Sequence, residues 1–126
     1  MGLLTNQNGL DQGIVVEINS GGGSVDYGVE KSTSTADRDL VGVMALKDWG
    51  NEVWATVAVR GNWYVAFEAS GSTYPRGDRI KVDSTDGLAE DAGGSMNGVF
   101  GMILANSAAP SDGDLGPCVI IPVEKG

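Results

Sequence analysis

The chain has 126 residues, with 17 Asp and Glu against 8 Lys and Arg, no histidine and one cysteine. This length supports a single hydrophobic core, and the net charge of −9 argues against affinity built on neutralising nucleic-acid phosphates. The lack of histidine removes the commonest general base near neutral pH and the commonest metal ligand, and Cys118 alone forms no internal disulfide.

The 20 glycines, the two phenylalanines and the short apolar runs predict an all-β protein. Residues 1–12, MGLLTNQNGLDQ, are typical of a flexible N-terminal arm with an exposed Leu3-Leu4 pair, and residues 13–126 are expected to form a single β-barrel domain. No run approaches membrane-spanning length, and the start lacks the pattern of a classical signal. We therefore expect synthesis in a cytoplasm and no membrane partner.

In chain order, residues 13–19 (GIVVEIN), 25–31 (VDYGVEK) and 40–46 (LVGVMAL) predict the first three strands. Residues 53–68 then predict a hairpin, because two β-type runs flank Gly61-Asn62. Its register would place Arg60 opposite Trp63 and Val59 opposite Tyr64. Both hairpin faces are apolar, which favours a closed barrel wall or a subunit contact.

The second half predicts strands at residues 79–83, 98–105 and 118–123, with 88–98 as a crossing segment and 106–117 as an acidic loop. Pro122 favours an edge position for the last strand. The sum is about eight short strands, as expected for a small closed or partly closed β-barrel.

Several motifs admit a chemical reading, and for each a structural reading is favoured. Arg76-Gly77-Asp78 spells an adhesion tripeptide, but it also fits a turn before a strand. The acidic loops could ligate a cation, yet none has the spacing of a calcium loop, and Asp is common in turns. Cys118 is expected to be a buried, inert thiol. We expect no catalytic residue, cofactor or metal.

Three tryptophans leave two interpretations open. Trp49, Trp54 and Trp63 would form a carbohydrate platform in one, whereas in the other Trp54 and Trp63, on one hairpin face with Phe67, belong to the core or to a subunit interface. Arg60 opposite Trp63 would add a cation–π contact.

From residue 57 onward, the order of turns and strands resembles the small β-barrel capsid decoration, or cement, proteins of tailed bacteriophages. The resemblance rests on Gly61 between two strands, then Gly77-Asp78 with Ile80, Val82, Asp83 and Gly87, then 98–104, and finally Gly113-Asp114 with 119–121. It covers about the last two thirds of the chain.

The resemblance implies a non-enzymatic structural virion protein on the outer capsid surface, bound to the major capsid protein and self-associated, with a trimer favoured over a dimer. It also implies that the N-terminal arm and the strand that follows order on the shell. The expected capsid or subunit contacts are Leu3, Leu4, Ile14, Val16, Trp54, Trp63 and Phe67. The alternative is a carbohydrate- or receptor-binding β module of a spike or surface layer.

Overall fold

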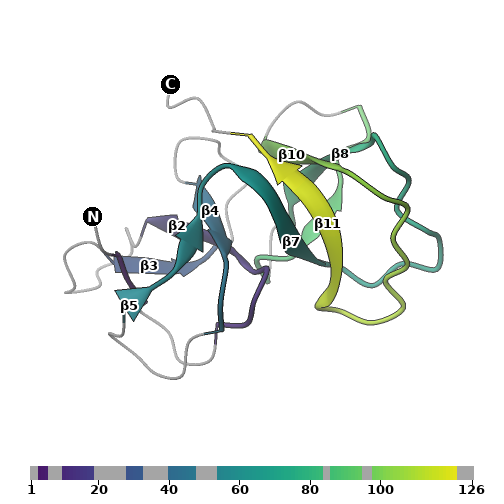
Figure 1. Cartoon of the computed structure of the whole chain (residues 1–126). Helices are drawn as coiled ribbons and strands as arrows, with labels where there is room; N and C mark the ends of the chain where they lie inside the picture. The colour runs from purple at the N-terminus through teal and green to yellow at the C-terminus, as the bar shows by residue number, and fades with distance from the viewer. Residues whose placement is uncertain are drawn as a thin grey trace.

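The structure is a computed structural model that describes residues 3–5, 10–18, 28–32, 40–47, 54–83, 86–94 and 98–121. In these ranges the chain forms eleven strands and no helix, so the all-β prediction is confirmed. The strands divide into two groups along the sequence, β1 to β6 and β7 to β11 (Figure 1).

The first group is a six-stranded sheet in the order β5-β1-β3-β2-β4-β6. All its pairs are antiparallel except β1 with β3. The strands are β1 (Leu3–Thr5), β2 (Val15–Ile18), β3 (Gly28–Lys31), β4 (Leu40–Met44), β5 (Trp54–Ala55) and β6 (Val57–Ala58).

The second group closes on itself as a five-stranded ring in the order β10-β11-β7-β9-β8, because β8 also pairs with β10. The long strands β7 and β11 run antiparallel through seven paired residues and curve together along one side of the ring (Figure 1). The strands are β7 (Gly61–Phe67), β8 (Arg79–Val82), β9 (Ala89–Asp91), β10 (Val99–Ile103) and β11 (Asp114–Ile120).

The predicted hairpin at residues 53–68 is wrong. β6 pairs with β4 in the sheet, whereas β7 pairs with β11 in the ring, so Trp63 lies opposite Cys118 and Tyr64 opposite Pro117. Gly61 does adopt the positive φ expected of it, at 95°, but it starts the ring instead of reversing the chain. The ladder with β11 instead pairs all seven residues of β7 with a strand from the end of the chain.

Two further boundaries differ from expectation. β9 lies inside the predicted crossing segment, and β11 begins at Asp114, four residues before the predicted start of the last strand at Cys118. The Pro117 carbonyl accepts from the Leu104 N–H, just past the end of β10. The nitrogen of Pro117 faces the same side, where the ladder stops, so the missing N–H costs no ladder hydrogen bond. Pro122, and the edge position expected for it, lie outside the described residues. The sequence predicted one barrel of about eight strands, whereas the described residues form a closed ring of five strands joined to a sheet of six.

Parts of the predicted N-terminal arm belong to the fold. Leu3–Thr5 forms β1, which pairs with both β3 and β5, and Leu10 is buried in a cluster with Val16 and Met44. The division of the chain between residues 12 and 13 stays a prediction.

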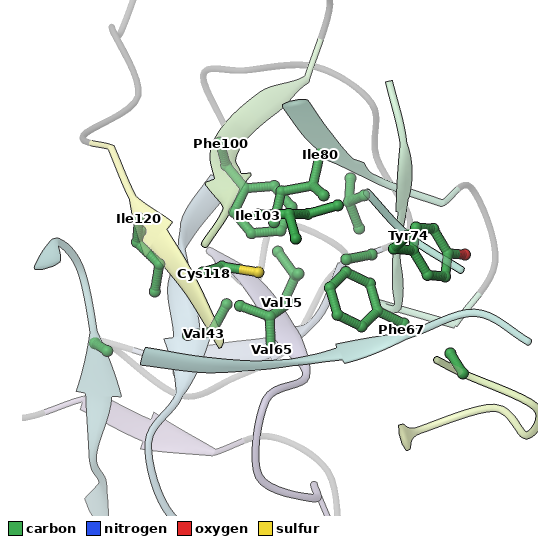
Figure 2. Close-up of a cluster of buried hydrophobic side chains, with 14 of the residues drawn as sticks. Val15, Val43, Val65, Phe67, Tyr74, Ile80, Phe100, Ile103, Cys118 and Ile120 are labelled. Atoms are coloured by element: carbon green, nitrogen blue, oxygen red, sulfur yellow. The ribbon is translucent and has the colours of Figure 1, made fainter. Parts of the chain in front are cut away.

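The main core is shared by the sheet and the ring. Val15 and Val43 of the sheet reach into the same cluster as Phe67, Ile80 and Cys118 of the ring (Figure 2). On the other face of the sheet a smaller cluster gathers Leu10, Val16, Val29 and Met44. β2 and β4 therefore bury side chains on both faces, which explains why their sequences are almost continuously apolar.

Candidate docking surface

The sheet and the ring are joined through the backbone of Gly13. Its N–H donates to the Met44 carbonyl at 2.7 Å, and its own carbonyl accepts from the Ala66 N–H at 3.0 Å. Gly13 has a φ of +86°, and a Cβ built there would lie 2.5 Å from the Ala66 nitrogen. Only glycine allows this approach without strain, so the relative placement of the two parts depends on this residue.

A groove of about 670 Å³ follows this junction. Its apolar side chains come from both parts of the fold, and two ion pairs border it, Lys31 with Asp86 at 3.6 Å and Lys47 with Asp11 at 3.3 Å. The lining residues are Leu10, Asp11, Gln12, Ile14, Lys31, Lys47, Ala66, Asp86, Leu88, Asp112, Gly113 and Leu115. A lining that mixes apolar side chains with charges of both signs suits a protein surface better than a single small anion.

The outer side of β7, β10 and β11 is also apolar. The side chains that alternate with the buried core positions of these strands point outward, and the register sets Pro117 beside Tyr64 and Met102 beside Val119. Tyr64 is 55% exposed, Leu115 41% and Leu104 38%. We call this surface the ring wall, and its members are Tyr64, Met102, Leu104, Leu115, Pro117 and Val119. Because Leu115 also lines the groove, the two surfaces are continuous.

Four carboxylates gather where β7 ends: Glu68, Asp83, Glu90 and Asp112. Burial raises the pKa of Glu68, and a hydrogen bond with Glu90 together with repulsion from the other three carboxylates raises this pKa further. Asp112 accepts from the Ala69 N–H at 2.7 Å, and Asp83 from the Asp86 N–H at 2.9 Å. The Asp83 bond agrees with the turn role expected for the acidic loops, whereas Asp112 ties its loop to the residue two positions past the end of β7. Among the described residues no three potential ligands form a metal-binding group. We call the four residues the acid cluster.

The other motifs have structural roles in this fold. Gly77 has a φ of +93°, and its N–H donates to the Ile103 carbonyl, which places Arg76-Gly77-Asp78 in a tight turn before β8. The Cys118 thiol is fully buried, and burial raises its pKa to about 12. A thiol in that state is a poor nucleophile, in agreement with the inert role expected of it.

The predicted contact residues are spread over the whole fold. Leu3 and Leu4 lie in β1 and Trp54 in β5, and the register sets Leu4 opposite Trp54. Ile14 is half-buried in the groove. Val16 and Phe67 are 0% exposed, and each belongs to a core cluster of this chain, where Phe67 stacks on Tyr74 with ring centroids 4.5 Å apart. Contact with a partner stays a prediction for this set.

The tryptophans do not share one strand pair. Trp54 is in the sheet and Trp63 in the ring, and Trp49 lies outside the described residues. The Trp63 side chain is 42% exposed, and its indole N–H donates to the Arg60 carbonyl at 2.8 Å. The described geometry therefore gives Arg60 a backbone bond to Trp63, where the sequence suggested a cation–π contact.

Sequence reasoning missed the ring wall and the groove. Residues 114–117 were assigned to a loop, so the outward alternation of Leu115, Pro117 and Val119 was not recognised as one face of a strand. The groove draws on positions around 12, 31, 47, 87 and 113, which are far apart in the sequence. The signal that could have found the wall is the run LGPCVII, which is apolar on both faces.

Comparisons with known proteins give a match at the level of structure. No family model matches the chain, and no curated protein matches it. Among solved structures, the chain is similar to the N base of the head fiber gp8.5 of bacteriophage phi29, with a TM-score of 0.57 and 17% sequence identity, over 95% of this chain and 91% of that one. The chain thus shares its fold over nearly its full length with the base of a phage head fiber.

Proposed function

We propose that this chain is a structural virion protein that attaches to the outer surface of a tailed-phage head and stabilises it. The observation that carries the proposal is the likeness of almost the whole chain to a head fiber base. The turn and strand pattern from Gly61 to Ile121 supports the same class of protein independently. Its role is mechanical and not catalytic, and its partner is the major capsid protein.

Within that class, the chain acts as a decoration or cement protein that bridges neighbouring coat subunits. An exposed apolar wall continuous with a groove supports this role, because such surfaces mark sites of protein contact. Self-association, with a trimer favoured, would add affinity, since linked copies bind a repeating shell with a higher effective concentration. Neither nucleic acid nor a membrane is needed. In the described part of the chain, no helix is long and apolar enough to cross a membrane.

The test is direct binding. Purified protein is mixed with expanded, undecorated heads, and bound protein is quantified after sedimentation across a range of concentrations. We expect saturable binding, and we expect decorated heads to retain their DNA at higher temperature than undecorated ones. Failure to bind contradicts the proposal. Binding to a soluble glycan on an array, lost in Trp63→Ala, would instead favour the receptor-binding alternative.

A further inference from the structure

Charge is segregated along β7. The acid cluster lies past its carboxyl end, around Glu68, whereas Arg60 precedes its first residue. The ring wall lies between these two ends. In a chain with 17 acidic residues against 8 basic ones, a face of this size without a carboxylate is a local exception.

The strand register shows which residues occupy each row of the wall. The row through Met102 continues to Arg79 on β8 in one direction, and to Val119 and Asn62 in the other. The neighbouring rows pair Pro117 with Tyr64, and Leu115 with Ala66. No row of the wall contains Asp or Glu, and its borders carry Arg79 on one side and Arg60 at one end.

The wall also has the composition of a binding core. Tyr64 presents an exposed aromatic ring on β7 beside Pro117, and the leucine, valine and methionine side chains of the wall continue it across β11 towards β10. Tyrosine and arginine are the residue types most often found to dominate binding energy in protein interfaces. Scattered surface leucines need no explanation, but a contiguous apolar face on a strongly acidic protein does.

We propose that the ring wall, bordered by Arg60 and Arg79, is the face that meets the shell, and that its counterpart is an apolar coat-protein surface edged with carboxylates. The inference rests on the proposed function and assigns the contact to one side of the ring. The wall itself brings no carboxylate to the contact, and the acid cluster comes nearest to it at Asp112, in the groove that Leu115 also lines.

The same charges disfavour a two-fold contact between copies through the wall. Such a contact would bring together two chains that each carry −9, and neither wall would offer the carboxylates that pair with Arg60 and Arg79. A head-to-tail contact with the acid cluster of another copy is the competing arrangement, and the experiment separates it from docking on the shell.

The experiment compares matched variants in the head-binding assay. Leu104→Asp introduces a charge into the wall, whereas Leu46→Asp introduces the same charge at a leucine that is 62% exposed, follows β4 and belongs to neither the wall nor the groove lining. We expect Leu104→Asp to abolish saturable binding and Leu46→Asp to stay within twofold of the wild type. Tyr64→Ala, a milder change, is expected to weaken binding at least tenfold.

Charge gives a second readout. We expect wild-type affinity to fall as salt rises from about 0.05 to 0.5 M, and Arg60→Glu to bind more weakly with a smaller salt dependence. Circular dichroism confirms that each variant is folded, and light scattering reports its oligomeric mass.

Three results would contradict the assignment of the ring wall to the shell contact, and one of them would also contradict the proposed function. Wild-type binding that survives both Leu104→Asp and Tyr64→Ala removes the wall from the contact and leaves the proposed function intact. Lost head binding together with a lower oligomeric mass would make the wall a contact between copies. If the wild type itself does not bind heads, the proposed function fails first.

Discussion

At the residue scale, Gly13 has a positive φ and also lies in close contact with the backbone of Ala66 in the ring. Gly77 shares its left-handed conformation, with φ of +93° against +86°, but a Cβ at Gly77 would meet nothing within 4 Å. We expect Gly77→Ala to cost about 1 kcal/mol from backbone strain alone. Gly13→Ala should cost at least about twice as much, because its Cβ would also collide with Ala66. Urea unfolding of both variants measures the difference, and equal losses would show that the junction is not tightly packed.

Glu68 gives a second residue-scale prediction, on pH. Its pKa is raised mainly by burial and then by Glu90, so between its unfolded and folded pKa values the folded chain binds more protons at this site than the unfolded chain. Its contribution to stability is therefore full at low pH and is lost as pH rises through the folded pKa. We expect the stability of the wild type relative to Glu68→Gln to fall as pH rises from the ordinary pKa of a glutamate through the raised pKa of the folded chain.

Glu90→Gln is the companion variant for that measurement. Removing the Glu90 carboxylate removes the second cause of the shift but leaves burial in place, so the pKa of Glu68 should move part of the way back to its ordinary value. Carboxyl NMR shifts of Glu68 report this directly. A pKa of Glu68 that does not respond to Glu90→Gln would mean that the two side chains are not in contact in solution.

At the scale of the element, β11 closes the ring by pairing with both β7 and β10. The reactivity of its buried thiol, Cys118, measures how often this strand detaches. The thiol is 0% exposed, and its pKa of about 12 leaves only about one molecule in ten thousand as thiolate at pH 8. We expect a disulfide reagent to modify Cys118 at the rate at which β11 detaches, and immediately in denaturant. Rapid modification of a protein that keeps its native circular dichroism would contradict the closed ring.

The strands themselves were largely predictable from sequence, whereas their partners were not. The branched and aromatic residues of β7 and the alternation of β8, in which Ile80 and Val82 are buried, identify strands locally. Pairing depends on residues far away, because Tyr64 meets Pro117 and not Val59. The hairpin prediction failed since Gly61 satisfies a turn and a change of sheet equally well.

The same limit applies to the candidate surface. Exposed apolar positions on β11 can be recognised only once the strand is known to start at Asp114. The groove is lined by residues near 12, 31, 47, 87 and 113, which only the folded chain brings together. Phe67 has a residue type common in interfaces, but its position opposite Asp114 and its stacking on Tyr74 place it in the core.

At the scale of the whole molecule, the sheet and the ring share one hydrophobic cluster and should unfold together. Val43 belongs to the sheet, yet it packs in the core that contains Phe67 and Cys118 (Figure 2). We expect Val43→Ala to destabilise the whole chain by about 2 kcal/mol, through lost burial and a small cavity. The matched control Val59→Ala, at a half-exposed position, should change stability by less than about 0.5 kcal/mol.

Amide hydrogen exchange shows whether the loss is shared. In Val43→Ala, the slowest amides of β2 and β4 and those of β7 and β11 should lose the same free energy of opening, because neither part keeps a complete core without the other. If the ring amides kept their protection while those of the sheet lost it, the two parts would be separate folding units. The proposed function on a shell would benefit from the first behaviour, since force applied to the ring is then resisted by the entire core.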